Sequence, residues 1–261
     1  MTKEIKNLEK GVLRIYESDG LELMAYDTKD PLGDQAILIK NNDTLISIEA
    51  PLFKSNVKEI NDYVESLDVK NQYVLLVDHV AVKDYLPKAK LITAKNALNA
   101  LTSGEPKGLY NNFLNIFGDS INAKLREDYD VVDNKFNIKG IELELFPRGN
   151  DFNVYIPKFN AIYTHMLGHD VHSIIAGKEH ALAMIEELNS FLDSGYELIL
   201  TSHYVPETKE DVKTKISYVE NILKINECSS NKEEFLNNVK KEYPNYSGLN
   251  YLDMTAGFFY K

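Results

Sequence analysis

The sequence has little cysteine and no long apolar run. Its 261 residues include one cysteine, Cys228, which excludes an internal disulfide and fits a reducing compartment. No apolar stretch approaches the roughly 20 residues that a membrane span needs. The first residues, Met1 to Lys6, lack the apolar region of a signal peptide. We therefore expect a cytoplasmic protein that does not bind a membrane.

The sequence also has fewer positively charged than negatively charged residues. The formal net charge is −11, and no run of lysine and arginine would form a basic patch, so we expect no nucleic-acid partner. A nucleophile elbow, a Walker loop and a Gly-x-Gly-x-x-Gly motif are also absent. Hydrophobic residues at 44% and charged residues at 26% are typical of a globular protein. A small molecule of unknown identity is the expected partner, and the oligomeric state is left open.

One stretch organises the chain. An apolar run of five residues ends at Val77 and predicts a fully buried strand. The polar cluster Asp78–Asp84 follows it, at the carboxyl end of the strand, where open α/β sheets place ligands. After the helix-incompatible step Leu86-Pro87, a second apolar pair predicts the next strand. The stretch therefore indicates a strand, a polar turn that carries the chemistry, and another strand.

The remaining patterns predict two blocks of strands, each followed by helices. Alternating residues at 11–17 and 21–27 flank Asp19-Gly20 and predict a hairpin, and a second hairpin precedes Glu49. Ser55 is expected to cap the next helix. We predict a helical insertion near 105–128 and two closing helices near 209–225 and 231–242. No linker or repeat interrupts the chain, so residues 1–261 are expected to form a single domain.

The polar turn resembles the His-x-His-x-Asp-His motif of the metallo-β-lactamase superfamily. His79 keeps the first histidine, whereas Ala81, Lys83 and Asp84 replace the other three ligands. Two further motifs match in part. His165 stands where the family has a metal-bridging aspartate, and Ser202-His203 resembles the strand end Gly-His. Two differences remain, since Glu49 replaces an aspartate and the segment 145–150 lacks the expected histidine.

The resemblance implies a divergent member of this superfamily with a degenerate metal motif. The implied fold class is α/β (α+β), a four-layer αββα sandwich of the metallo-β-lactamase type. Its implied metal ligands are His79, Asp84, His165 and His203. A mixture of histidine and aspartate suits one Zn, Mn or Fe ion. The permanent cation Lys83 disfavours a second dication nearby by several kcal/mol.

Two interpretations of function stay open. In the first, the protein is a metallo-β-lactamase-like hydrolase with an altered, mononuclear site. Its substrate is unknown, and Lys83 and Asp78 are the candidate catalytic residues, with Lys83 orienting an anionic group. In the second, it is a catalytically inactive protein of this fold that binds no metal and acts as a binding or interaction module. His169 and His172 form another candidate cluster with His165, although a polar loop with incidental histidines is the simpler interpretation.

Overall fold

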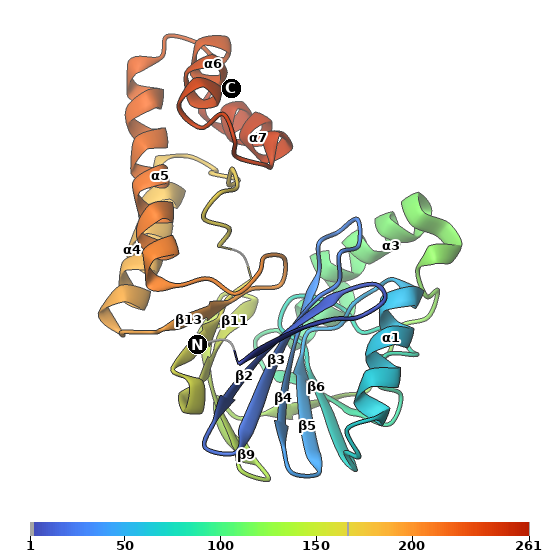
Figure 1. The fold of residues 1–261 in the computed structure, drawn as a ribbon. Coiled ribbons are helices and arrows are strands. Elements are labelled where there is room, and N and C mark those ends of the chain that lie inside the picture. Colours follow the sequence, from blue (N-terminus) through green and yellow to red (C-terminus); the bar gives the residue numbers. More distant parts are fainter. Residues whose placement is uncertain (1–2, 166, 261) are drawn as a thin grey trace. The chain divides into compact units, whose positions relative to one another are not determined.

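The computed structural model describes residues 3–165 and 167–260 (Figure 1). Contacts group the chain into two compact units. Unit 1 comprises residues 1–166 and 198–206, and unit 2 comprises residues 167–197 and 207–261. A division of the chain into two compact groups of contacts does not by itself show that each group folds as an independent domain. The single domain over 1–261 therefore stays a prediction.

Unit 1 contains an eight-stranded sheet whose strands follow one another in chain order. The strands from β1 to β5 pair antiparallel, and those from β5 to β8 pair parallel. Their bounds are β1 (Glu4–Asn7), β2 (Val12–Ser18), β3 (Leu21–Asp27), β4 (Gln35–Asn41), β5 (Thr44–Ile48), β6 (Asn71–Leu75), β7 (Lys90–Ala94) and β8 (Tyr129–Val132). The buried strand predicted before Asp78 is β6, which ends two residues earlier than the apolar run.

Both predicted hairpins are confirmed. Asp19 and Gly20 join β2 to β3 with φ values of 47° and 83°, the left-handed conformation that two-residue hairpin turns require. Asn42, with φ of 50°, lies in the turn between β4 and β5. Asparagine, aspartate and glycine tolerate this conformation best, so the local sequence fixes the register of these strands.

A second sheet in unit 1 has five strands in the order β13-β12-β11-β10-β9. Their bounds are β9 (Lys135–Ile138), β10 (Ile141–Arg148), β11 (Asp151–Ile156), β12 (Ala161–Tyr163) and β13 (Leu198–Leu200). β13 pairs parallel with β12, whereas the other pairs are antiparallel. One cluster of buried side chains includes residues of both sheets, among them Leu23 and Leu143. The predicted mixed α/β class with two sheets is thus confirmed.

The helices of unit 1 differ from the prediction in detail. α1 (Lys54–Glu65) buries Val57, Ile60 and Val64 in the core, as its helical spacing predicts. The expected cap at Ser55 is wrong, because Phe53 occupies the N-cap position and no side chain caps this end. The helical part of the predicted insertion is confirmed as α3 (Glu105–Phe117), which follows the short α2 (Leu98–Ser103). A single 3₁₀ turn, η1 (Gly118–Ser120), follows α3, and residues 121–128 are not helical.

Unit 2 consists of four helices in its described residues. They are α4 (Lys178–Asp193), α5 (Lys209–Cys228), α6 (Lys232–Glu242) and α7 (Leu249–Phe259). The two helices predicted near 209–225 and 231–242 are confirmed as α5 and α6. They do not close the chain, because α7 follows α6 and buries Leu252 and Ala256 in a core shared by all four helices. None of the helices in the described part of the chain combines the length and the apolar character that crossing a membrane requires.

Lys215 on α5 is a buried cation in unit 2. Only 1% of its surface is exposed. Its Nζ donates to the carbonyl oxygens of Gly168 at 2.8 Å and of Val171 at 2.6 Å, and it lies 4.8 Å from the centre of the Tyr218 ring. Burial lowers the pKa of the Lys215 ammonium to about 7. The two carbonyl bonds offset the cost of burying this group and fasten residues 168–171 to α5.

Replacing Lys215 by methionine should destabilise unit 2. Lys215→Met keeps the aliphatic stem but removes the donor of the Val171 carbonyl and one of the two donors of the Gly168 carbonyl, and we expect the free energy of unfolding to fall by about 1–3 kcal/mol. Urea unfolding followed by circular dichroism measures the change. Lys213→Met is the matched control, since this exposed lysine on the same helix pairs only with Glu210 on the surface. Equal stability of the two variants would contradict the role given to Lys215.

Candidate metal centre

Three histidines of unit 1 converge from the ends of three strands. His79 follows β6 of the larger sheet, whereas His165 and His203 follow β12 and β13 of the smaller one. The centroid of the His79 ring lies 5.2 Å from that of the His165 ring and 5.0 Å from that of the His203 ring. The centroids of the His165 and His203 rings are 5.0 Å apart. One ligand atom from each ring lies within 4.8 Å of the other two.

This arrangement fits one metal ion. A tetrahedral zinc ion with bonds of about 2.0–2.1 Å to nitrogen holds its ligand atoms roughly 3.4 Å apart, a separation that the three rings reach with a small adjustment. All three histidines are partly exposed, and the side chains of His165 and His203 are each 21% exposed. An ion can therefore enter from solvent, and three protein ligands leave coordination positions for water or substrate.

The electrostatics of the site keep the three rings neutral. Burial lowers the pKa of His79 well below its usual value, and the neighbouring imidazoles lower it further. Burial likewise lowers the pKa of His165 to about 3 and that of His203 to about 4. Metal ions bind the neutral imidazole, so at neutral pH the three rings are in the form that coordinates.

A carboxylate lies behind two of the three rings. Asp78 Oδ2 is 3.2 Å from His165 Nδ1, and Asp34 Oδ1 is 3.5 Å from His203 Nδ1. Carboxylates in such positions fix the tautomer of a histidine and make its other nitrogen a better metal ligand. Sequence reasoning missed Asp34, whose only signal is its place in the Pro31–Asp34 loop immediately before β4. Burial raises the pKa of Asp34 well above its usual value, and Asp34 Oδ2 bonds no group in the described part of the chain.

Glu49, which directly follows β5, fixes the turn that carries His79. Its side chain is fully buried, and Oε1 accepts from the backbone N–H of Asp78 at 2.8 Å, while Oε2 accepts from that of His79 at 3.2 Å. The Tyr163 hydroxyl donates to the same carboxyl group at 3.1 Å. Burial raises the pKa of Glu49 to about 8, in opposition to these hydrogen bonds. Glu49 also has φ of 62°, a strained value for a residue with a side chain.

A chain of hydrogen bonds continues from Glu49 to the two segments that carry His165 and His203. The hydroxyls of Tyr163 and Ser202 are 2.8 Å apart, and Ser202 Oγ is 2.8 Å from His165 Nδ1. Tyr163 is the last residue of β12, and Ser202 immediately precedes His203. These hydrogen bonds therefore connect the three segments that carry the histidines. Tyr163 was missed by sequence reasoning, because an apolar strand end gives no sign of a buried hydroxyl network.

Comparisons with known proteins identify solved structures that have a similar fold. No protein-family model matches the sequence, and no curated protein matches it. Among solved structures, an inverting sec-alkylsulfatase from Pseudomonas sp. aligns with a TM-score of 0.61 at 14% identity, over 92% of this chain and 49% of that chain. A metallo-β-lactamase from Erythrobacter litoralis aligns with a TM-score of 0.53 at 11% identity, over 84% and 96% of the two chains. A chemotaxis sensor from T. denticola gives 0.52 at 10% identity, over 80% and 93%.

The chain has the metallo-β-lactamase fold. The resemblance that the motifs predicted is confirmed at the level of the fold, since identities of 10–14% carry no more than that. Glu49 contacts the turn that carries His79, and the rings of His79, His165 and His203 converge.

Two residues of the metallo-β-lactamase motif do not join the three histidines. Asp84, expected as a fourth ligand, is exposed, accepts a hydrogen bond from the Asn122 side chain and is not part of the histidine group. Lys83 is exposed and lines a separate surface hollow. The reason is the backbone path after Val80, which turns to pair residues 81–83 with residues 124–126. We therefore leave Lys83 and Asp84 out of the candidate centre and keep Asp78.

A different cation lies near the centre. The positive charge of Arg148, at the end of β10, lowers the pKa of both His165 and Asp78, so the guanidinium is within electrostatic range of both. This arginine belongs to the segment 145–150, where the resemblance led us to expect a histidine ligand. Arg148 also forms an ion pair with Asp151, with Nε 2.9 Å from Oδ1. The positive charge of Arg148 disfavours a second metal ion beside His165 and Asp78.

The other two candidate histidines belong to unit 2. The Nδ1 of His169 is 2.7 Å from Glu207 Oε1, and the Nδ1 of His172 is 2.9 Å from the Tyr218 hydroxyl. The described residues from His165 to His172 form no helix. Each histidine has a local partner of its own, which agrees with the simpler interpretation of this segment.

Removing the Glu49 carboxyl group should destabilise the protein strongly. Glu49→Ala leaves the backbone N–H groups of Asp78 and His79 without their acceptor and removes one of the two partners of the Tyr163 hydroxyl, and we expect a loss of about 3 kcal/mol in the free energy of unfolding. Tyr163→Phe removes only one bond to this group and should cost about 1 kcal/mol. Urea unfolding measures both. Glu65→Ala, a change at an exposed glutamate of α1, is the control; a Glu49 variant as stable as this control would refute the anchoring role.

Proposed function

We propose that His79, His165 and His203 bind one divalent metal ion and that the protein is a hydrolase with a mononuclear site, acting on a small molecule. The observation that carries this proposal is the convergence of the three ligand atoms within 4.8 Å. The neutral state of the rings and the carboxylates behind two of them support it. Hydrolases also occur among the proteins of this fold, as the names metallo-β-lactamase and alkylsulfatase state.

The donor set fits the ions that the sequence led us to expect. Imidazole nitrogen suits zinc and iron, and manganese accepts it together with oxygen ligands. When bound, such an ion would lower the pKa of coordinated water toward about 7 and polarise the bond to be cleaved. Three neutral imidazoles add no negative charge, and burial raises the pKa of Asp34 well above its usual value, so the negative charge near the ion would come mainly from Asp78 behind His165.

Asp78 is the residue best placed to move a proton. Its side chain is 29% exposed, so water reaches it, and its Oδ2 lies 3.2 Å from His165 Nδ1. Burial raises the pKa of Asp78 to about 6, and Asp151 raises it further while Arg148 lowers it. A carboxyl group that titrates near neutral pH accepts and returns protons efficiently. Asp78 would thus orient His165 and serve as the general base of the hydrolysis.

A binding module without catalysis is the second candidate function. It is favoured by the loss of the motif residues at Ala81, Lys83 and Asp84, and by the chemotaxis sensor that shares the fold. Assays of the metal-loaded protein on a lactam, a sulfate ester and a phosphate diester separate the two. Turnover that falls at least 100-fold in Asp78→Asn supports the hydrolase. Stoichiometric metal without turnover of any substrate supports the binding module.

Loss of one histidine should release the metal. We expect His203→Ala to lower the metal content from about one ion per chain to background and to remove the rise in melting temperature that added Zn²⁺ gives the wild type, because an ion that binds only the folded state stabilises it. Elemental analysis and thermal unfolding measure the two effects. His180→Ala, at an exposed histidine of α4, is the control and should retain the ion. A wild type that takes up no Zn²⁺, Mn²⁺ or Fe²⁺ would refute the proposal.

The ion should stay bound in mild acid. Protons compete with metal for a histidine only near and below its pKa, and burial lowers the pKa values of His165 and His203 to about 3 and 4. Zinc occupancy should therefore change little between pH 7.5 and about pH 5 and fall below about pH 4. Equilibrium dialysis across this range measures it. A midpoint near 6.5, the value of an ordinary histidine, would show that the rings are not held in the neutral form.

A further inference from the structure

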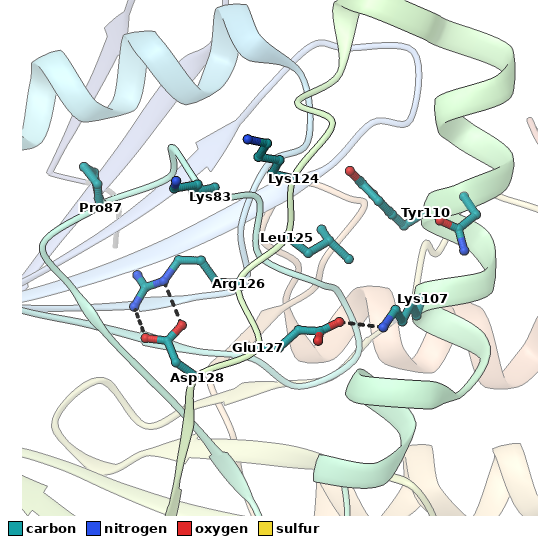
Figure 2. Close-up of a pocket in the computed structure, with 10 residues that line it drawn as sticks. Lys83, Pro87, Lys107, Tyr110, Lys124, Leu125, Arg126, Glu127 and Asp128 are labelled. Atoms are coloured by element: carbon teal, nitrogen blue, oxygen red, sulfur yellow. Dashed lines mark hydrogen bonds and ion pairs between the residues drawn. The ribbon is translucent and has the colours of Figure 1, made fainter.

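A basic hollow of about 940 Å³ lies on the surface of unit 1 (Figure 2). It is lined by the turn after His79, by α3 and by the segment 124–128. Four of its side chains are cationic, namely Lys83, Lys107, Lys124 and Arg126, against two carboxylates. Such a surplus of positive charge is unusual in a chain with a net charge of −11.

Backbone pairing brings two of these lysines together. Val82 and Leu125 form an antiparallel bridge, the Lys83 N–H donates to the Lys124 carbonyl at 2.7 Å, and the Arg126 N–H donates to the Ala81 carbonyl at 3.0 Å. This register sets Lys83 directly opposite Lys124. Like charges in that relation destabilise a pair of strands, since opposite side chains have their Cβ atoms about 5 Å apart. Figure 2 shows both lysines at the rim of the hollow, across from Lys107 and Tyr110.

The carboxylates of the hollow do not neutralise this pair. Glu127 bonds Lys107 at 2.5 Å. Asp128 accepts from two nitrogens of Arg126, at 3.1 Å and 2.9 Å. Within the described residues neither Lys83 nor Lys124 forms an ion pair, and Asp84, next to Lys83 in the chain, bonds Asn122 instead.

Arg126 adds a third cationic group to the lining of the hollow. Its guanidinium bonds Asp128, and its Nη1 is buried and bonds no described residue. The exposed lysines Lys83 and Lys124 are therefore the cations that can meet a ligand from solvent. An anion between them would relieve their mutual repulsion.

We propose that this hollow binds a small ligand that carries linked phosphate groups. Two opposed ammonium groups match an anion with at least two charged groups better than a monoanion, and the volume suits a small molecule. A long nucleic acid is disfavoured, because beyond the hollow it would meet a surface with a net negative charge. The site is independent of the histidine centre, and its ligand needs no metal ion on the protein.

Inorganic pyrophosphate is the probe for this proposal. Calorimetric titration into metal-free protein at low ionic strength, without magnesium, should show one site per chain whose affinity falls as salt is added. The double variant K83A/K124A should weaken this affinity at least tenfold, because each lysine in contact with the anion is worth about fivefold. The control K70A/K95A removes the same charge at exposed lysines outside the hollow and should change the affinity less than twofold.

Three outcomes would overturn the proposal. The first is no binding of pyrophosphate at millimolar concentration, and the second is an equal loss of affinity in the two double variants. The third is tighter binding of a single-stranded ten-nucleotide DNA than of pyrophosphate by the same lysines, which would make the hollow a nucleic-acid site. His203→Ala should bind pyrophosphate like the wild type, and loss of binding there would assign the anion to the histidine centre instead.

Stability without ligand gives a second readout of the same site. Because Lys83 and Lys124 repel each other, Lys124→Ala should raise the melting temperature of the ligand-free protein at low salt, and a given concentration of pyrophosphate should stabilise this variant less than the wild type. Lys70→Ala should leave both quantities unchanged. A Lys124→Ala protein that is less stable than the wild type, or one that pyrophosphate stabilises as much as the wild type, would contradict the proposal.

Discussion

The candidate metal centre depends on one buried carboxyl group. Glu49 accepts hydrogen bonds from the turn that carries His79 and from Tyr163, and Tyr163 passes the connection through Ser202 to His165. Without this acceptor, the backbone N–H groups of Asp78 and His79 would lose their partner, the Tyr163 hydroxyl would keep only Ser202, and the loops that carry the three histidines would lose their common anchor. The strained backbone of Glu49 and the burial that raises its pKa show that the fold tolerates a local cost at this position.

The histidine centre combines a kept and an altered part of the metallo-β-lactamase pattern. By the resemblance seen in the sequence, His79 and His203 match histidines of the motif, whereas His165 takes the position of an aspartate. In the structure the carboxyl groups lie behind the rings instead, with Asp78 behind His165 and Asp34 behind His203. Such carboxylates still tune a metal site through the rings that they contact. Arg148 meanwhile brings a cation into electrostatic range of His165 and Asp78, which is compatible with one metal ion and disfavours two.

The location of Lys83 depends on the path of the backbone and differs from the one that its position in the motif predicted. In the sequence it replaces a metal ligand, which suggested a cation inside the site. In the structure the segment after Val80 pairs with residues 124–126, and Lys83 faces Lys124 at a surface hollow. Unit 1 thus carries two candidate sites with opposite charge preferences. Three neutral imidazoles are suited to a metal cation, and a cluster of ammonium groups is suited to an anion.

The sequence by itself determined the elements and the fold. Hairpin turns at Asp19-Gly20 and the apolar run before Asp78 are local signals, because backbone conformation and side-chain periodicity depend on near neighbours. The three histidines were found because their segments resemble the metal motifs of the metallo-β-lactamase superfamily. The tertiary structure decided which residues complete the site. Asp34, Tyr163 and the outward path of Lys83 and Asp84 depend on contacts between segments far apart in the chain, and helix α7 depends on the core of unit 2. Long-range packing selects these partners, and no local pattern records that choice.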